Sequence, residues 1–270
     1  MFETTSEAPA PAPPRPVYLS GDVHLGAVSR ERERAFLRWL EHAGQTSSQL
    51  ILNGDLFDFW FEYRSVIPRG HTRVLGALAA LVDAGVPVTL LGGNHDWWGG
   101  SYLEEEVGVT FLREPAVMEL AGRQVYVAHG DGLGRGDLSY RLLRLMLRSG
   151  VTRWAFRWVH PDLGTLVARR VSKTEERGAT RDEKERAAAL ADWGIAKLRA
   201  KPELDLVVLG HTHTPVMTEI EPGRWYVNAG DWVVHHSYLV LERAAAPRLL
   251  EWEGDGSVKD PGRRGSPAAR

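Results

Sequence analysis

Five short motifs rich in aspartate, histidine and asparagine hold the residues of this sequence that are best suited to chemistry. Five of the ten histidines of the chain lie inside these motifs, which scattered surface histidines would not do. Each motif directly follows a short run of apolar residues. In chain order the motifs are Gly21-Asp22-Val23-His24, Gly54-Asp55-Leu56-Phe57-Asp58, Gly93-Asn94-His95-Asp96, His129-Gly130-Asp131 and Gly210-His211-Thr212-His213.

The residue types of the motifs point to metal binding. Aspartate, histidine and asparagine offer oxygen and nitrogen ligands that suit Mn²⁺, Fe²⁺ or Zn²⁺. The chain has no cysteine, which excludes disulfides, thiolate nucleophiles and thiolate metal sites. Two ions roughly 3.5–4 Å apart, bridged by a carboxylate, can activate water and clamp the attacking and leaving oxygens of a phosphoryl group. The motifs therefore predict a two-metal centre for phosphoryl chemistry.

A single motif of this kind carries little weight, because Gly-Asp is commonly a turn and one Asn-His pair is uninformative. The five motifs carry weight together, because each of them follows a run of strand type. Polar groups at the carboxyl ends of strands converge on one crevice of an α/β sheet. Glycines in the motifs allow sharp turns and close backbone approach around that crevice. We therefore expect the five motifs to form one site.

The elements that must position the motifs are short strands separated by helices. Helical patterns at 30–42 and 72–84 separate the first three strands, which is βαβ spacing and predicts a buried sheet covered by helices. The later strands lie closer together, so an antiparallel portion is expected there. The predicted strands are Val17–Leu19, Leu50–Leu52, Val88–Leu91, Val125–Ala128, Leu206–Leu209, Trp225–Val227 and Tyr238–Leu241.

Length and composition are those of an ordinary globular α/β protein. The chain has 270 residues, of which 43% are hydrophobic and 25% charged, and its net charge is -2. We expect one domain over 17–253, with a helical insertion at about 133–200 and disordered tails at 1–16 and 254–270. No segment has the pattern of a secretory signal or the length of a membrane span.

Taken together, the five motifs resemble the five sequence blocks of the calcineurin-like metallophosphoesterases. The resemblance implies a four-layer αββα sandwich with a helical cap insertion, and a centre of two divalent metal ions. It also implies that His95 lies beside the substrate phosphate as proton donor or charge stabiliser, with Asp58 orienting it. The implied metal ligands are Asp22, His24 and His213 for one ion, Asn94, His129 and His211 for the other, and Asp55 as the bridge.

The helical insertion is strongly basic. Residues 135–181 include eleven basic side chains against four acidic ones, an excess that the near-neutral total hides. Arg141, Arg144 and Arg148 are spaced three and four apart, so they share one face of a helix. A basic helix with bulky apolar neighbours can lie at an anionic membrane surface or bind an amphiphilic phosphate. The alternative is a solvated arginine face above an ordinary core-packing stripe.

A narrower resemblance concerns the run from His129 to Arg141 and the helices after it. This run is similar to the UDP-2,3-diacylglucosamine diphosphatases of lipid A synthesis, which are Mn²⁺-dependent and release UMP and an acylated sugar 1-phosphate. One position departs, since the best-known members have arginine where this chain has His95, whereas the wider superfamily has histidine. The substrate contacts that the resemblance implies are Asn94, Asp137, Tyr140, Arg141, Ser172 and Lys173.

These resemblances lead to a set of expectations about partners and place. We expect a UDP-linked lipid sugar or another phosphate ester as substrate, Mn²⁺ as the metal with Fe²⁺ or Zn²⁺ as alternatives, and no nucleic acid or protein partner. The expected location is cytoplasmic, peripheral on the inner face of the cytoplasmic membrane.

Two alternative functions remain open. A broader phosphatase or phosphodiesterase acting on soluble nucleotides is the alternative enzyme. A non-catalytic metal-binding scaffold is the other class, although every expected ligand position is occupied. The stretch 228–232 also follows a strand and is assigned a structural role.

Overall fold

Two β-sheets lie face to face at the centre of the protein. The structure is a computed structural model that describes residues 14–134, 144–171, 181–253 and 257–259. Its strands are β1 (Val17–Ser20), β2 (Gln49–Leu52), β3 (Val88–Leu91), β4 (Thr110–Leu112), β5 (Ala116–Leu120), β6 (Arg123–Val127), β7 (Leu206–Leu209), β8 (Val216–Glu221), β9 (Arg224–Asn228), β10 (Ser237–Leu241), β11 (Arg248–Trp252) and β12 (Val258–Lys259). One sheet has the order β12-β11-β10-β1-β2-β3-β4 and the other has the order β5-β6-β7-β9-β8.

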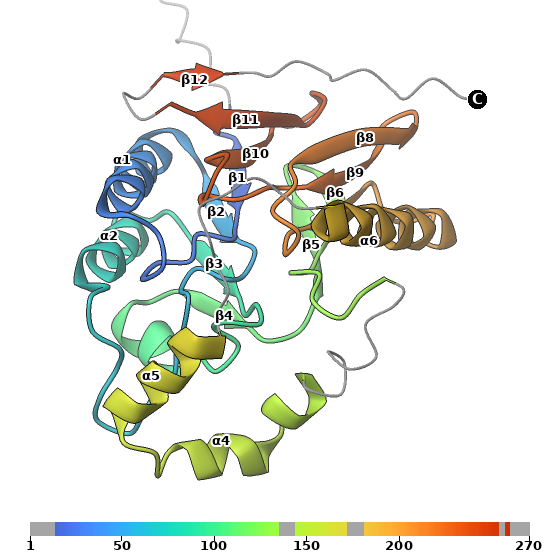
Figure 1. Ribbon diagram of the computed structural model, residues 1–270. Helices are drawn as coiled ribbons and strands as arrows, with labels where there is room; N and C mark the ends of the chain where they lie inside the picture. Colours follow the sequence, from blue (N-terminus) through green and yellow to red (C-terminus); the bar gives the residue numbers. More distant parts are fainter. Residues whose placement is uncertain (1–13, 135–143, 172–180, 254–256, 260–270) are drawn as a thin grey trace, which may run out of the picture.

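Helices cover the outer face of each sheet. The helices are α1 (Arg30–Thr46), α2 (Thr72–Asp83), α4 (Gly150–Phe156), α5 (Pro161–Val171) and α6 (Arg181–Ala200), with a π-helical turn η1 (Tyr102–Glu106). Figure 1 shows α1 and α2 beside the seven-stranded sheet and α6 beside the five-stranded sheet. The layers are therefore helix, sheet, sheet and helix, as the αββα expectation requires.

Three apolar clusters hold these layers together. One joins α1 and α2 to the outer face of the seven-stranded sheet, with Phe36 and Trp39 fully buried. A second lies between the two sheets and includes Leu19, Ile51 and Val208. The third joins α6 to β7 and β9. Each side chain buried in this way contributes roughly 1.5–3 kcal/mol, so the strands that carry the motifs are fixed on both faces.

The directions of the strands bring the motif loops together. β1, β2 and β3 run parallel to one another, and β6 runs parallel to β7 in the second sheet. The five motifs follow the carboxyl ends of these five strands. Backbone hydrogen bonds join the first two loops directly, because the amides of Val23 and His24 both donate to the carbonyl of Asp55, at 2.9 and 3.0 Å.

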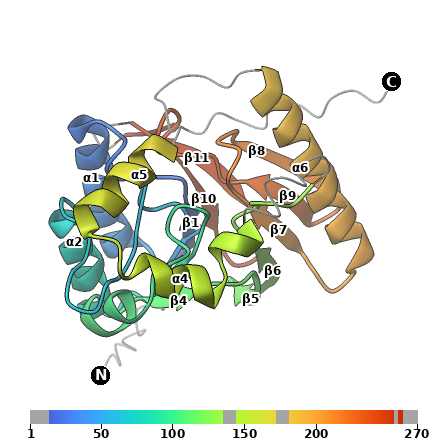
Figure 2. The same ribbon diagram turned by 60° about the horizontal axis from the view of Figure 1, so that its bottom comes forward.

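The structure differs from the expected elements in two places. The predicted strands are present, but β4, β5, β8, β11 and β12 are additional, and β12 lies inside the tail expected at 254–270. Of the helical stretch expected at about 133–200, α6 packs on the five-stranded sheet as an outer layer of the sandwich. In the described part of this stretch, α4 and α5 instead lie away from both sheets, at the bottom of Figure 1 and at the front of Figure 2.

No helix in the described part of the chain combines the length and apolar character that crossing a membrane would need.

Candidate metal centre

The loops that follow β1, β2 and β7 hold their metal-binding side chains on an unusual backbone. Five of the eight described non-glycine residues with positive φ are expected ligands, with φ between 50° and 67°. Each such residue costs about 1 kcal/mol or more, although aspartate and histidine tolerate the left-handed region better than most. The surrounding strands and hydrogen bonds must stabilise these residues in their strained backbone conformation. The five residues are Asp22, His24, Asp55, His211 and His213.

The first ligand group consists of Asp22, His24 and His213, whose ligand atoms all lie within 4.8 Å of one another. The Nε2 atoms of His24 and His213 face each other at 3.2 Å, and Nε2 of His213 lies 3.4 Å from Oδ1 of Asp22. Both carboxylate oxygens of Asp22 also accept from the amide of His211, at 3.1 and 3.0 Å. This group is the one that the sequence resemblance implies for one ion.

The second ligand group consists of Asp55, His129 and His211. Oδ2 of Asp55 lies 3.2 Å from Nε2 of His129 and 3.7 Å from Nε2 of His24, so one carboxylate reaches both groups. The side-chain oxygen of Asn94 lies 3.2 Å from Nε2 of His129. The structure therefore brings all seven expected metal ligands together, with Asp55 between the two sets.

Backbone carbonyls and glycines set the orientation of these ligands. Nδ1 of His129 donates to the carbonyl of Asn53 at 2.9 Å, which turns Nε2 toward Asp55 and Asn94. A β-carbon on Gly93 would lie 2.1 Å from Oδ1 of Asp55, and one on Gly210 would lie 2.5 Å from Oδ2 of Asp22. Only glycine leaves room for these carboxylates.

Burial and the charges of neighbouring ligands shift the pKa values of the individual ligands in different directions. Burial alone would raise the pKa of Asp55, but the imidazoles of His129 and His95 hold it well below the ordinary value. Burial lowers the pKa of His211 to about 4, so this ring is neutral near pH 7. Burial opposes protonation of His213 too, yet its hydrogen bond to Asp22 raises its pKa to about 9. A cation bound here must displace that proton, so binding weakens as pH falls.

The donor set fits two divalent cations. Imidazole Nε2 atoms that face one another at 3.2 Å, with carboxylate oxygens around them, are an arrangement that a shared cation stabilises. The ligands are histidine, carboxylate and one amide oxygen, which suit manganese, iron or zinc. Asp22, His24 and His213 would hold one ion and Asn94, His129 and His211 the other.

His95 and Asp58 lie at the edge of the ligand groups. Nδ1 of His95 donates to the backbone carbonyl of Asp58 at 2.7 Å, whereas the Asp58 carboxylate is 3.8 Å away and lies closer, at 3.4 Å, to Nδ1 of His24. Asp58 is thus adjacent to His95, but its main-chain oxygen makes the short contact. Burial would lower the pKa of His95, and the charges of Asp55 and Asp58 raise it.

Two buried carboxylates support the ligands and were not assigned this role from sequence. Asp96 accepts from the amides of Gly93 and Leu56, at 2.8 and 2.7 Å, and so ties the third motif loop to the second. Asp231 lies 3.7 Å from Nδ1 of His213 and accepts from the amide and ring of His235, at 3.0 and 3.1 Å. A carboxylate behind a ligating histidine fixes its ring and tautomer.

A sequence pattern could have identified the Asp231 carboxylate as part of the site. It lies in a Gly-Asp pair that follows strand β9, the same pattern as the first two motifs. The stretch was expected to be structural, and the structure places its Asp231 carboxylate 3.7 Å from Nδ1 of the expected ligand His213. Among the expected substrate contacts, Asn94 is within the site, whereas Asp137, Tyr140, Arg141, Ser172 and Lys173 lie outside the described residues.

The site and the fold define a metal-dependent phosphoesterase. The sequence model of the calcineurin-like phosphoesterases matches residues 15–215, which is most of the chain. The chain belongs to this family and is a metal-dependent hydrolase; the family uses a centre of two divalent metal ions.

Several curated relatives that share one name are similar to this chain over most of its length. A protein of Porphyromonas gingivalis named UDP-2,3-diacylglucosamine hydrolase is 32% identical over 245 residues, covering 84% of this chain and 94% of its own length. Proteins with the same name from Pseudomonas putida and Aeromonas hydrophila are each 30% identical, over 220 and 228 residues. These alignments cover 80% and 81% of this chain and 90% and 91% of those proteins.

Proposed function

We propose that this hydrolase cleaves the pyrophosphate bond of UDP-2,3-diacylglucosamine, giving the acylated sugar 1-phosphate and UMP. The proposal rests on the relatives named for that hydrolase, which are 30–32% identical over four-fifths or more of this chain. In the reaction, the oxygen of water joins one phosphorus while the bridging oxygen leaves with the other phosphorus and takes up a proton.

The distances between the ligand atoms support the proposed roles of the metal ligands. When bound, the two divalent ions supply positive charge that makes water more acidic and stabilises charge on the phosphoryl oxygens. Asp55, whose Oδ2 lies 3.2 and 3.7 Å from ligand nitrogens of the two groups, is proposed to bridge them. Mn²⁺ is the proposed metal. One ion is assigned to Asp22, His24 and His213, and the other to Asn94, His129 and His211.

His95 is proposed to act on the phosphate. Its Nδ1 proton is used by the carbonyl of Asp58, so Nε2 is the nitrogen left to face a substrate. Nearby Asp55 and Asp58 raise the pKa of the ring, which favours a protonated His95 that donates from Nε2 to a phosphate oxygen. Asp58 is proposed to orient the ring, chiefly through its main-chain oxygen.

The acyl chains and the membrane are proposed to meet the surface of α4 and α5. Seven of the twelve large apolar side chains that are exposed in the described residues fall between 145 and 166. Trp154 and Trp158 are 62% and 79% exposed, and Arg153 and Arg157 lie on the same helix or directly after it. Amphipathic aromatic and basic groups of this kind bind the interface of anionic lipids. Such binding would hold the enzyme at the inner face of the cytoplasmic membrane.

The test is a comparison of three substrates with purified, Mn²⁺-loaded protein. We expect UMP release from the diacyl UDP-sugar in detergent micelles. The value of kcat/KM should be about a hundredfold or more above that for soluble UDP-N-acetylglucosamine, which lacks the acyl chains. Bis(4-nitrophenyl) phosphate serves as a small generic ester. A substrate without the acyl chains loses the binding energy that the insertion supplies.

A second candidate is a broader phosphatase or phosphodiesterase that acts on soluble nucleotides. The observation in its favour is His95, because histidine at this position follows the wider family rather than the best-known lipid-sugar hydrolases. Efficient cleavage of soluble esters without UMP release from the lipid sugar would establish it. Metal-loaded protein that turns over none of the three substrates would instead be a non-catalytic scaffold.

A further inference from the structure

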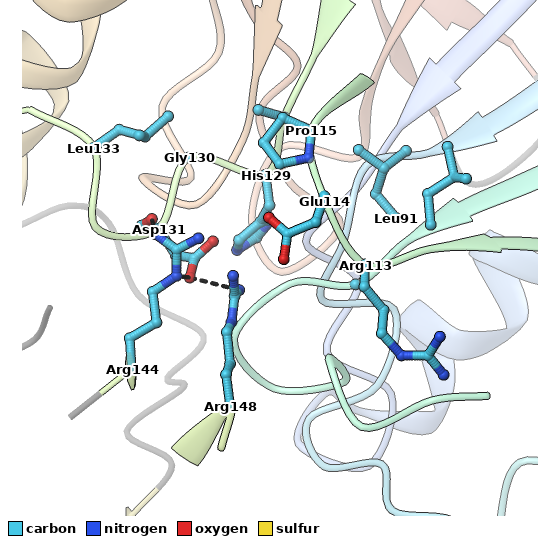
Figure 3. Close-up of a pocket in the computed structure, with 13 residues that line it drawn as sticks. Leu91, Arg113, Glu114, Pro115, His129, Gly130, Asp131, Leu133, Arg144 and Arg148 are labelled. Carbon is cyan, nitrogen blue, oxygen red and sulfur yellow. Dashed lines mark hydrogen bonds and ion pairs between the residues drawn. The ribbon is translucent and has the colours of Figure 1, made fainter. Parts of the chain in front are cut away.

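An ion-pair group connects the fourth motif to the helical insertion. Asp131 lies two residues after the metal ligand His129, and its side chain is buried. Its Oδ2 accepts from Nε of Arg144 at 3.0 Å and from Nη2 of Arg148 at 2.8 Å. Its main-chain oxygen accepts from Nη1 of Arg144 at 2.9 Å. Figure 3 shows both arginines converging on this carboxylate beside His129, at a pocket that Leu133 and Pro115 help to line.

The same segment also contacts the third motif. The guanidinium of Arg148 lies 5.0 Å from the centre of the Trp97 ring, and Trp97 directly follows Asp96. The indole Nε1 of Trp98 donates to the carbonyl of Leu147 at 3.0 Å. Residues 144–148 are therefore joined to the loops that carry Asn94 and His129, two expected ligands of one ion.

These contacts bear on the basic face, for which an anionic membrane surface, an amphiphilic phosphate and solvent were the expected alternatives. Arg144 and Arg148 were expected to share one helical face, and a solvated face was one alternative, yet their side chains turn toward Asp131 and are only 24% and 13% exposed. Two guanidinium groups around one buried carboxylate are short, charge-assisted contacts with defined geometry, and salt screens them little. The group is therefore suited to fix the position of the helical insertion rather than to bind a lipid surface.

A further attachment of the insertion, within the described residues, is aromatic and also involves Trp98. Phe156 of α4 packs against Phe61 and Trp98, with ring centres 4.7 and 4.9 Å apart. These ring contacts involve no expected metal ligand, whereas the ion pairs tie the start of the described insertion to Asp131, two residues after His129. The ion-pair group is therefore the attachment that can fix the position of the insertion relative to the metal centre.

We propose that Asp131, Arg144 and Arg148 form a clasp that positions the helical insertion over the metal centre, so that a lipid-linked substrate meets both at once. The proposal rests on the proposed function, because it assigns the recognition of the lipid part to the insertion. The three residues are positioning residues. A small ester that contacts only the metals should not need the clasp, whereas a substrate that spans the metals and the insertion should.

The test compares Arg148→Ala with Arg199→Ala, which removes an equal charge from the exposed end of α6. With Arg148→Ala, we expect kcat/KM for the diacyl UDP-sugar to fall roughly ten- to a hundredfold, the range for a lost charge-assisted hydrogen bond. Turnover of bis(4-nitrophenyl) phosphate should stay within about twofold. Amide hydrogen exchange over 144–158 should become about tenfold faster. Arg199→Ala should change none of these values.

A double-mutant comparison tests whether the residues act as one unit. The variant that combines Asp131→Asn with Arg148→Ala should lose no more lipid-sugar activity than the worse single variant. Equal losses on both substrates, or unchanged hydrogen exchange over 144–158, would overturn the clasp. Wild-type protein that releases no UMP would overturn the proposed substrate instead. The exchange comparison needs no substrate, so the two failures are distinguishable.

Discussion

The metal-ligand loops and the surface of α4 and α5 are opposite in construction. The loops bury charged and polar side chains, and several of their residues hold left-handed backbone under strain. The insertion does the reverse, because it exposes large apolar side chains such as Trp158, which lies just after α4 and is 79% exposed. Each arrangement is costly for folding alone, since buried charges lose hydration and exposed apolar groups stay in water.

The difference indicates that each region is built for a different part of a ligand. Buried carboxylates and imidazoles become favourable when cations neutralise them, and exposed apolar surface becomes favourable when an apolar partner covers it. On the proposed function, the first region carries out the reaction and the second recognises the lipid part of the substrate. The following changes should separate the two, beginning with the largest effect.

The largest loss should come from the residue shared by both ligand groups. Asp55→Asn removes the charge that faces His129 and His24. We expect kcat to fall about a thousandfold or more on lipid-sugar and small ester alike, because charge stabilisation in a buried site carries much of the rate. Metal content by elemental analysis should fall as well. Asp83→Asn, an exposed exchange at the end of α2, is the control, and unchanged metal content in Asp55→Asn would refute the bridge.

A methyl group on Gly93 should damage the same region by geometry alone. The new β-carbon would meet Oδ1 of Asp55 at 2.1 Å and the Asp55 amide at 2.6 Å, so the ligand must move. A shift of about 1 Å in a reacting group costs roughly a hundredfold, which kcat should report with both substrates. Gly76→Ala in α2 has no neighbour within 4 Å and should instead stabilise the fold by about 0.5–1 kcal/mol in thermal unfolding. Full activity of Gly93→Ala would show that this loop is not rigid.

Removing the carboxylate behind His213 should weaken metal binding without touching an ion directly. We expect Asp231→Asn to lower the affinity of one of two metal ions about 10- to 100-fold, measured by titration calorimetry. His235→Gln keeps the carboxylate and loses only its ring partner, so the affinity should change about twofold at most. If both variants weakened metal binding equally, the role of Asp231 would be to stabilise the 231–237 loop rather than to orient His213.

The smallest expected effect belongs to the exposed surface of the insertion. Replacing Trp154 and Trp158 together by glutamine should lower lipid-sugar turnover on anionic vesicles about tenfold, because their interfacial contacts are lost. Turnover of the small ester should stay the same. Val117→Gln, which changes an exposed apolar residue on β5, should affect neither substrate. A parallel loss on the small ester would make these tryptophans part of the fold instead.

The parts of the fold that the sequence predicted are those buried on both faces. β1, β3 and β7 are mostly apolar, and every residue in them is buried. The strands that were not predicted lie at or next to sheet edges, where half-exposed side chains weaken the apolar pattern. Val216–Glu221 in β8, for example, has no fully buried residue. Helical periodicity in α6 was visible, but periodicity alone cannot say that the helix packs on a sheet rather than in an insertion.

In the candidate site, local ligands were predictable and long-range supports were not. Asp22 and His24 are two positions apart, so their shared role shows in one short motif. The Asp231 carboxylate meets His213 only after β8 and β9 have formed, and the pairing of Asp131 with Arg148 depends on how the insertion folds back. Such contacts are set by tertiary packing, which no short spacing encodes.

The most direct measurement of the central claim is anomalous diffraction from crystals of the Mn²⁺-loaded protein at the manganese absorption edge. We expect two peaks roughly 3.5–4 Å apart. One should be bound by Asp22, His24 and His213, the other by Asn94, His129 and His211, and Asp55 should touch both. A single peak, or two peaks that share no carboxylate, would contradict it.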